Sequence, residues 1–263
     1  MITLKKLREK NPLVICITND VVQNYTANGL VALGASPAMS IYKDDLVDLL
    51  KYASALLINI GTLTDAAVTR FNDACQIANE YGVPIILDPV AAGGSKYRLE
   101  TCKYILENYN IDVVRGNASE IGALIGENIE SKGVDSSAVS NIGDLALKAN
   151  KVLKTAVVIT GKIDAVCVDE KVNLLKNGSE MMPKVIGTGC LLGAVVGAFV
   201  GTDKENLLDT LSYCLSCYNI AGELAEKKEN GHLPGTYQIE FLNSLYELSD
   251  EDVVKYKRVE TYE

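Results

Sequence analysis

The 263-residue sequence contains no tryptophan and only one histidine, His232. A single histidine cannot build a histidine-rich metal site within one chain. A catalytic triad around His232 is disfavoured as well, because this residue lies in a turn-like segment far along the chain from the glycine-rich turn at residues 187–190. No Gly-x-Gly-x-x-Gly follows the first predicted strand, so the usual fingerprint of nicotinamide dinucleotide binding is missing.

Runs of basic residues are absent too, and the formal net charge is -9. Proteins hold nucleic-acid backbones with clustered lysine and arginine side chains. We therefore expect no nucleic-acid partner. A small polyanionic ligand would need local help from a divalent metal, a helix N-terminus and one or two placed cations.

No segment is typical of a secretory signal or a membrane span. The N-terminus has charges with no apolar core behind them. The uncharged run at residues 185–202 begins in a glycine turn, and only residues 190–200 look helical and apolar, which is too short to cross a bilayer. We expect no membrane association.

The seven cysteines are an odd number and are scattered from Cys16 to Cys217. This is typical of free thiols in a reducing compartment, so we expect a cytoplasmic protein. Cys214 and Cys217 have the spacing of a redox or zinc pair. They fall inside a predicted helix without a second pair, which favours packed core thiols.

Short β-branched runs alternate with longer helical patterns along the chain. The predicted buried strands are residues 13–18, 55–60, 84–88, 112–115 and 156–160, and the predicted helices include residues 21–33, 64–81 and 118–125. Nearly continuous apolar strands separated by helices predict an α/β fold with a parallel sheet covered on both faces. We expect one domain over residues 1–263.

The second half of the chain follows a different pattern. Residues 164–168 and 172–175 predict a hairpin around residues 169–171, and the chain then turns helical from Gly187 nearly to its end. The charged tail after Leu248 shows no pattern of regular structure.

Polar residues follow each predicted strand. Parallel α/β sheets bind ligands beyond the carboxyl ends of their strands, so these residues are candidates for a site. They are Asn19, Asn59, Asp88, Arg115 and Thr160. Each by itself is equally typical of a turn or a helix cap, and their common position at one sheet edge is what indicates a site.

The glycine-rich turn Gly187-Thr188-Gly189-Cys190 runs straight into an apolar helix. Two glycines allow the backbone to curl so that successive N–H groups point at one spot, where the helix dipole adds positive charge. The turn is therefore a candidate phosphate cradle, although a tight turn before a core helix fits equally well. We expect the helix N-terminus to lower the pKa of Cys190 and make its sulfur a plausible base.

Phosphoryl transfer needs an anion cradle, a metal held by carboxylates, a cation and a group near the attacking hydroxyl. The candidates are the turn at residues 187–189 for the cradle, Asp88 and Glu120 for Mg²⁺, Arg115 for the cation and Cys190 for the proton. Glu120 also stands three residues after Asn117, the spacing of a capping box. Metal contact and capping both remain open for Glu120.

Several segments along the chain together form a recognisable signature. It begins with NPLVICITN at residues 11–19 and continues with pieces at residues 27–30 and 32–39. Further pieces lie in the same order at residues 58–63, 87–90, 115–121, 132–135, 160–161 and 187–190. These segments resemble hydroxyethylthiazole kinase, a ribokinase-like enzyme family of thiamine salvage. The resemblance covers most of the chain to about Phe199 and implies a three-layer sandwich with a mostly parallel central sheet.

The resemblance also implies an activity, the ATP-dependent phosphorylation of the primary hydroxyl of 4-methyl-5-(2-hydroxyethyl)thiazole. By the resemblance, the thiazole is contacted by Met39 and Gly187, with Asn19 nearby, and ATP by Arg115, Thr160, Thr188 and Gly189. Mg²⁺ is served by Asp88 and Glu120. Cys190 stands where related kinases usually have an aspartate base. The family is a homotrimer with active sites between subunits, so the same assembly is expected here.

This chain departs from the family's pattern at three places. Ile15 stands where members commonly have histidine, Ile186 where they commonly have threonine, and Ala91-Ala92 in a loop that is usually richer in glycine. Other functions therefore stay open: a ribokinase-like kinase of another small heterocyclic alcohol such as a pyrimidine, a lyase of the same fold that repairs hydrated nicotinamide cofactors, or a nucleotide sensor without enzymatic activity. The lyase normally has aspartate after Gly-Thr-Gly, where this chain has Cys190.

Overall fold

A computed structural model of the chain describes residues 2–127 and 142–263. The matching segment at residues 132–135 lies outside these described residues. The strands are β1 (Leu13–Ile17), β2 (Ser36–Ala38), β3 (Ala55–Asn59), β4 (Ile85–Asp88), β5 (Val113–Asn117), β6 (Ala156–Thr160), β7 (Asp164–Val168), β8 (Lys171–Leu175) and β9 (Val259–Tyr262). The α-helices are α1 (Leu4–Lys10), α2 (Gln23–Leu33), α3 (Lys43–Leu50), α4 (Asp65–Tyr81), α5 (Lys96–Asn108), α6 (Ala118–Leu124), α7 (Ile142–Leu153), α8 (Thr188–Thr202), α9 (Leu207–Glu226), α10 (Pro234–Glu247) and α11 (Asp250–Tyr256).

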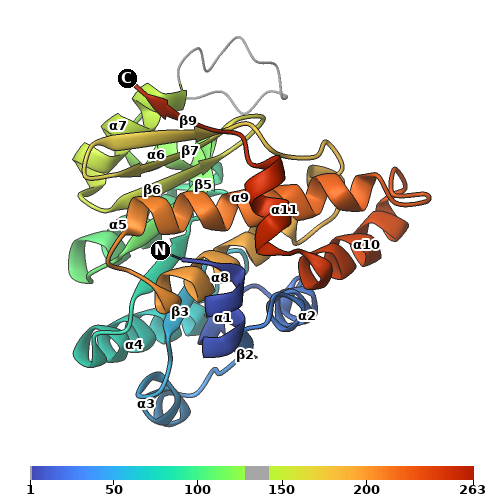
Figure 1. Ribbon diagram of the computed structural model, residues 1–263. Coiled ribbons are helices and arrows are strands. Elements are labelled where there is room, and N and C mark those ends of the chain that lie inside the picture. Colours follow the sequence, from blue (N-terminus) through green and yellow to red (C-terminus); the bar gives the residue numbers. More distant parts are fainter. Residues whose placement is uncertain (1, 128–141) are drawn as a thin grey trace.

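All described strands join one sheet in the order β2-β1-β3-β4-β5-β6-β7-β8-β9 (Figure 1). The strands from β2 to β6 run parallel, and β7, β8 and β9 are added in antiparallel pairs. β1 has β2 on one side and β3 on the other, so the chain changes direction across the sheet at β1. A crevice at such a switch point is the usual ligand position in open α/β sheets.

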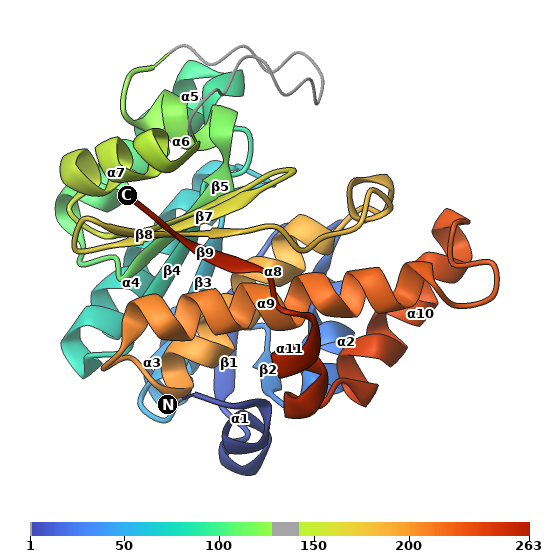
Figure 2. The same cartoon turned by 45° about the horizontal axis from the view of Figure 1, so that its top comes forward.

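Helices cover both faces of the sheet, as the alternating apolar pattern requires. Val14 and Cys16 of β1 belong to one core layer, whereas Ile15 and Ile17 belong to the other. The first layer is completed by α1, α2, α8, α9, α10 and α11, and the second by α3, α4, α5, α6 and α7 (Figure 2). The predicted α/β three-layer sandwich is confirmed.

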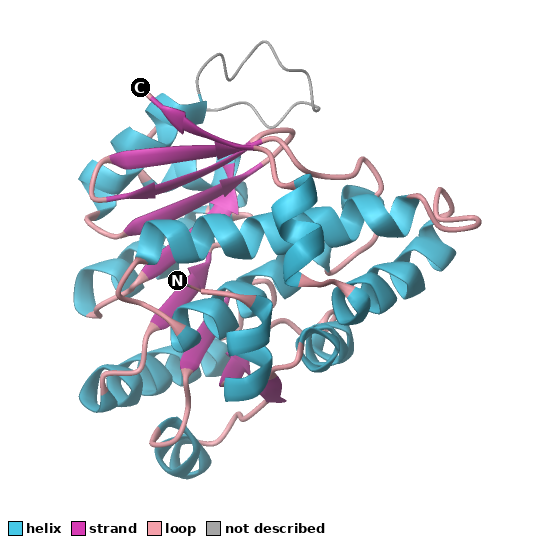
Figure 3. Ribbon diagram, in the orientation of Figure 1, coloured by secondary structure: helices cyan, strands magenta, loops and turns pink. Residues whose placement is uncertain are grey.

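Local signals in the sequence set the helix ends as predicted. The Thr64 hydroxyl accepts a hydrogen bond from the Ala67 amide at the start of α4, and Gly82 ends this helix in the left-handed conformation with φ 67°. Asn117 and Glu120 form a complete capping box at the start of α6. The predicted hairpin is also present, as β7 and β8 (Figure 3).

The expectation of an irregular tail after Leu248 was wrong. Ser249 caps α11, and β9 then pairs antiparallel with β8. Asp250 fixes this segment to the start of the chain, because its carboxylate accepts the backbone N–H groups of Leu4 at 2.7 Å and Lys5 at 3.2 Å. Contacts with residues so distant in sequence give order to a charged segment that has little apolar pattern of its own.

The helix α8 lies against β1, β3 and β4 on one side and against α2 and α9 on the other. Its apolar residues are buried almost all around the helix, which explains the uncharged run in the sequence. Within residues 2–127 and 142–263, none of the helices combines the length and apolarity that crossing a bilayer requires.

Candidate active site

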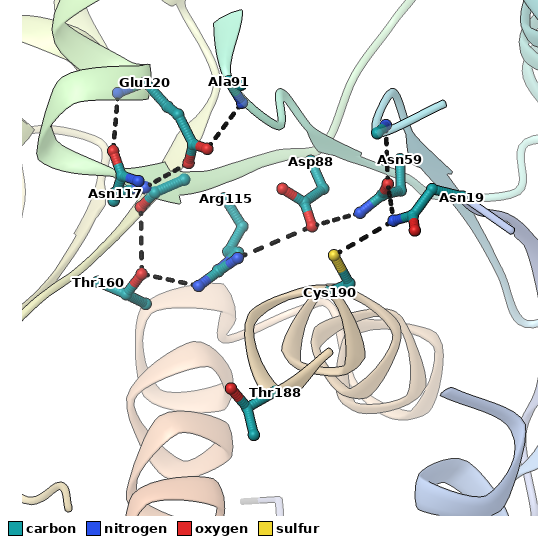
Figure 4. Close-up of polar contacts among 12 residues, drawn as sticks. Asn19, Asn59, Asp88, Ala91, Arg115, Asn117, Glu120, Thr160, Thr188 and Cys190 are labelled. Carbon is teal, nitrogen blue, oxygen red and sulfur yellow. Dashed lines mark hydrogen bonds and ion pairs between the residues drawn. The ribbon is translucent and has the colours of Figure 1, made fainter. Parts of the chain in front are cut away.

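A chain of polar contacts runs across the carboxyl ends of neighbouring strands (Figure 4). Asn19, which follows β1, donates from Nδ2 to Asn59 Oδ1 of β3 at 2.9 Å, and Asn59 Nδ2 donates to Asp88 Oδ2 of β4 at 2.8 Å. Arg115 Nη1 of β5 lies 3.7 Å from Asp88 Oδ2, and Arg115 Nη2 donates to Thr160 Oγ1 of β6 at 2.7 Å. The side chains that the strand-end argument selected are therefore brought together.

This polar chain is buried at the edge of an apolar sheet. Asn59 is 1% exposed, Asp88 is fully buried and Arg115 is 8% exposed. Burial of such groups is costly unless they are hydrogen-bonded or charge-paired, and the contacts along the chain provide most of that compensation.

Within the chain of polar contacts, two buried side-chain atoms have no hydrogen-bond partner. Asp88 Oδ1 and Arg115 Nε are both buried and make no hydrogen bond. Burial raises the pKa of Asp88 to about 7, with Arg115 opposing the rise and Glu120 adding to it. Unsatisfied buried polar atoms on two neighbouring charged side chains are typical of a place that a ligand or ion completes.

The first turns of α8 lie directly against this pair of charges. Gly187 caps the helix at φ 101°, and no side chain caps the helix at this end. A Cβ atom on Gly189 would lie 3.3 Å from Arg115 Nη1, and one on Gly193 would lie 3.5 Å from Asp88 Oδ2. The candidate cradle, the cation and the carboxylate are therefore neighbours in space, as phosphate binding requires.

Cys190 is half-buried in the first turn of α8, and its Sγ accepts a hydrogen bond from Asn19 Nδ2 at 3.4 Å. Burial raises the pKa of the Cys190 thiol above its ordinary value, and the charge of Asp88 raises it further. Hydrogen bonds from Asn59 and Asn19 oppose this shift without reversing it. The expectation of a lowered pKa was wrong, because burial next to a carboxylate disfavours the charged thiolate.

The side chains of Glu120 and Thr188 form hydrogen bonds with backbone groups. Glu120 Oε1 accepts the Ala91 N–H at 2.9 Å and Oε2 accepts the Asn117 N–H at 2.8 Å. The Thr188 hydroxyl donates to the backbone carbonyl oxygens of the preceding loop, at Met182 and Val185. The capping role of Glu120 is confirmed, and the Thr188 hydroxyl is engaged with the preceding loop.

The model of the family described as "Hydroxyethylthiazole kinase family" matches residues 4–251 of this sequence. The chain belongs to the hydroxyethylthiazole kinase family. One relative is "Hydroxyethylthiazole kinase 1" of Streptococcus pneumoniae strain JJA, which is 58% identical over 259 residues and aligned over 98% of this chain and 100% of its own length.

Solved structures agree with this assignment. A hydroxyethylthiazole kinase protein from Pyrococcus horikoshii OT3 has a TM-score of 0.90 at 37% identity, over 99% of this chain and 97% of its own. A ribokinase-like superfamily protein from Enterococcus faecalis V583 has a TM-score of 0.62 at 13% identity, over 91% of this chain and 95% of its own, and shows the fold alone. Membership of the kinase family, rather than the fold, is what bears on activity.

The three departures from the family's pattern differ in their position relative to the site. Ile15 is fully buried in the core layer opposite to α8, so its side chain faces away from the cradle. Ile186 is 76% exposed directly before the cradle. Ala91 has a left-handed φ of 54°, a conformation that favours glycine, and its N–H donates to Glu120.

The remaining predicted residues take no part in the polar chain. Met39 follows β2 and is partly buried against the core layer of α8. Gly187 packs closely against Tyr25, because a Cβ atom there would lie 2.9 Å from Tyr25 Cδ1. Cys214 and Cys217 are free and fully buried, as predicted for core thiols.

Sequence reasoning assigned no role to several polar residues that the structure places here. Asn59 was visible only as a strand-end residue, although it joins Asn19 to Asp88. Asp164, Tyr218 and Asn219 were not selected at all. The available signal for Asn219 was its position as a polar residue within the apolar face of α9, where it is 4% exposed.

Proposed function

We propose that this protein transfers the γ-phosphoryl group of ATP to the primary hydroxyl of 4-methyl-5-(2-hydroxyethyl)thiazole, as a single domain over residues 1–263 in thiamine salvage. Family membership and the names of its relatives support the substrate. The observation that carries the proposal is the position of Arg115, which lies against Gly189 at the start of α8 and 3.7 Å from Asp88.

The reaction joins the thiazole hydroxyl oxygen to the γ-phosphorus and breaks the bond between that phosphorus and the oxygen that leaves with ADP. The hydroxyl proton is released in the same reaction. Because the transition state is loose, positioning and charge neutralisation contribute more than a base. The amides of Gly187, Thr188 and Gly189 form the cradle in this proposal, and Arg115 and Thr160 contact the nucleotide.

The carboxylates fit a Mg²⁺ ion that is held only in part by protein. Asp88 Oδ1 is a hard oxygen without a partner, and Glu120 adds negative charge nearby. Within the described residues, no group of three or more histidine, cysteine, aspartate or glutamate side chains could hold a metal. Mg²⁺ keeps several waters and substrate phosphates as ligands, and when bound it would neutralise the charge of the phosphates.

Cys190 and Asn19 serve the alcohol side of the site in this proposal, and Met39 and Gly187 contact the thiazole. The contact between Asn19 and Cys190 Sγ holds the thiol at the crevice beside β1. Burial keeps the pKa of the Cys190 thiol above its ordinary value, so Cys190 could accept the hydroxyl proton only after losing its own.

We propose further that the protein is a homotrimer whose active sites lie between subunits. Exposed apolar side chains flank the predicted substrate residues, since Val21 is 74% exposed, Ile41 51% and Tyr42 74%. Such a group near Asn19 and Met39 is what an interface beside the site would cover.

All seven cysteines are free, which supports a reducing compartment such as the cytoplasm.

The test is incubation of the protein with ATP, Mg²⁺ and hydroxyethylthiazole, followed by mass detection of the phosphate ester. A pyrimidine alcohol and a hydrated nicotinamide cofactor are tested in parallel, and kcat/KM is compared. The highest kcat/KM for the thiazole supports the proposal. Preference for the pyrimidine alcohol, dehydration of the nicotinamide hydrate, or binding of ATP without turnover would each replace it.

A further inference from the structure

The turn between β6 and β7 is held from inside by a buried carboxylate. Asp164, the first residue of β7, is 4% exposed. Its Oδ1 accepts the Gly161 N–H at 2.9 Å, and its Oδ2 accepts a hydrogen bond from Asn219 Nδ2 of α9 at 2.7 Å. The turn that directly follows Thr160 is therefore tied to α9 through both oxygens of one side chain.

The residue before Asn219 holds the other half of the site. Tyr218 is 1% exposed, and its hydroxyl donates to the backbone carbonyl oxygen of Thr188. Thr188 is the first residue of α8 and the middle of the candidate cradle. The position of the cradle backbone is thus also set from α9.

Arg115 lies between these two anchored segments. Its Nη2 donates to Thr160 at 2.7 Å, and its Nη1 would lie 3.3 Å from a Cβ atom on Gly189. The separation between the cradle and the β6–β7 turn therefore decides whether one guanidinium group can serve both. α9 packs against α8 and against β7, so one helix contacts both segments.

We propose that Tyr218 and Asn219 are positioning residues for ATP: as neighbours on one helix, they fix the phosphate cradle and the β6–β7 turn at a set distance on either side of Arg115. The inference rests on the proposed ATP site. Neither residue needs to touch the nucleotide, because each acts through a group that does. A displacement of about 1 Å between such groups is enough to weaken binding and turnover strongly.

Other polar side chains of α9 make contacts away from this site and provide a matched control. Tyr213 donates its hydroxyl to Asp250, which lies at the junction of α11 and the start of α1. Tyr213→Phe therefore removes a tyrosine hydroxyl from the same helix, and its partner is distant from Thr188 and Gly161.

The experiment compares Tyr218→Phe, Asn219→Leu, the exchange Asp164→Asn with Asn219→Asp, and the control Tyr213→Phe. The exchange keeps both hydrogen bonds, because an amide at position 164 can accept the Gly161 N–H through its oxygen and donate to a carboxylate at position 219. Calorimetry measures the Kd for a non-hydrolysable ATP analogue with Mg²⁺, and separately for hydroxyethylthiazole. Thermal unfolding gives the Tm of each variant.

We expect Asn219→Leu to raise the Kd for the ATP analogue about tenfold, and Tyr218→Phe about threefold, with a clearly smaller change in the Kd for the thiazole, because only Gly187 of the cradle is assigned to that ligand. The exchange should restore most of the nucleotide affinity, and Tyr213→Phe should lower the Tm without changing the Kd. If Asn219→Leu does not fold, Tyr218→Phe and the exchange are judged by the same criteria.

Equal effects on both ligands, or the same Kd for the ATP analogue in Tyr218→Phe and the wild type, would overturn the inference. Nucleotide binding is measured without an acceptor alcohol, so a wild-type protein that binds ATP but does not phosphorylate the thiazole contradicts only the proposed function. A wild-type protein that does not bind the analogue overturns both.

Discussion

At the scale of single residues, Cys190 keeps its proton because its surroundings favour the neutral thiol. Burial and the neighbouring Asp88 raise its pKa, while the hydrogen bonds from Asn59 and Asn19 act in the opposite direction. A thiol that is protonated at rest contributes little as a base to a reaction with a loose transition state. Most of the rate enhancement should then come from the cradle and from Arg115.

Replacement of Cys190 tests this division of roles. Cys190→Ala should lower kcat only in part, by about tenfold, since the base is a minor contribution. Cys190→Asp should stay active, because Asn19 Nδ2 can donate to a carboxylate as it does to the thiol. Steady-state kinetics provide the measurement, with Cys75→Ala as a control at a buried thiol of α4. Complete loss of turnover in a folded Cys190→Asp protein would contradict the prediction.

Asp88 predicts a dependence of stability on pH in the ligand-free protein. Its pKa is raised by burial from 3.8 to about 7, so the folded state binds the proton more tightly than the unfolded state between these values. This contribution to the free energy of unfolding is fully present below pH 3.8 and is lost as the pH rises through about 7.

Asp88→Asn should therefore make the free energy of unfolding fall less steeply as the pH rises. We expect the loss of unfolding free energy between about pH 5 and about pH 8 to be smaller in the variant by about 2 kcal/mol. Urea unfolding without Mg²⁺ or nucleotide measures it, and Asp45→Asn, at an exposed position of α3, controls for the removal of one negative charge. Identical slopes for Asp88→Asn and the wild type would show that Asp88 does not control this dependence.

At the scale of elements, the start of α8 depends on a backbone conformation that favours glycine. Gly187 has φ 101°, and a Cβ atom there would lie 2.9 Å from Tyr25 Cδ1. Gly82 at the end of α4 also has a positive φ, 67°, but a Cβ atom would meet nothing within 4 Å. The two glycines share the backbone strain that alanine would suffer and differ in the space around them.

Alanine at each position separates these effects. Gly82→Ala should lower the free energy of unfolding by about 1 kcal/mol and leave kcat/KM unchanged, because only backbone strain is added. Gly187→Ala should cost more stability and also lower kcat/KM, since the first turn of α8 must shift away from Tyr25. Denaturant unfolding and kinetics on both variants check this. Equal losses of stability with unchanged kinetics would remove Gly187 from the cradle.

At the scale of the whole molecule, exposed apolar residues lie near the substrate end of the sheet. Tyr42 and Tyr52 are both 74% exposed, but Tyr42 follows the carboxyl end of β2, whereas Tyr52 precedes the opposite end of β3. Only Tyr42 lies near the edge that carries Asn19 and Met39. This pair of tyrosines therefore distinguishes an interface beside the site from general surface apolarity.

We expect light scattering to give the mass of three chains for the wild-type protein. Tyr42→Asp should shift this mass towards a single chain and lower kcat/KM with it, because a charge opposes burial in an interface. Tyr52→Asp should leave both unchanged. A monomeric wild type, or a trimer unaffected by Tyr42→Asp, would contradict the assembly proposed here.

Local signals in the sequence were sufficient for most elements of the fold. Apolar runs predicted β1, β3, β4, β5 and β6 to within one or two residues. Thr64, Gly82 and the Asn117 capping box marked helix ends, because caps depend on residues at most a few positions apart. β9 was missed, since its order comes from pairing with β8, more than eighty residues earlier in the chain.

The sequence by itself determined the α/β fold, the polar residues at the strand ends and the glycine turn before α8, because each depends on neighbours along the chain. Only the tertiary structure decided which of these groups meet and what their surroundings do to them. Arg115 lies beside Gly189, and Asp164 is held by Asn219, through contacts between distant segments. The direction of the pKa shift of Cys190 was likewise decided by tertiary structure, since burial and a carboxylate at the end of β4 raise it.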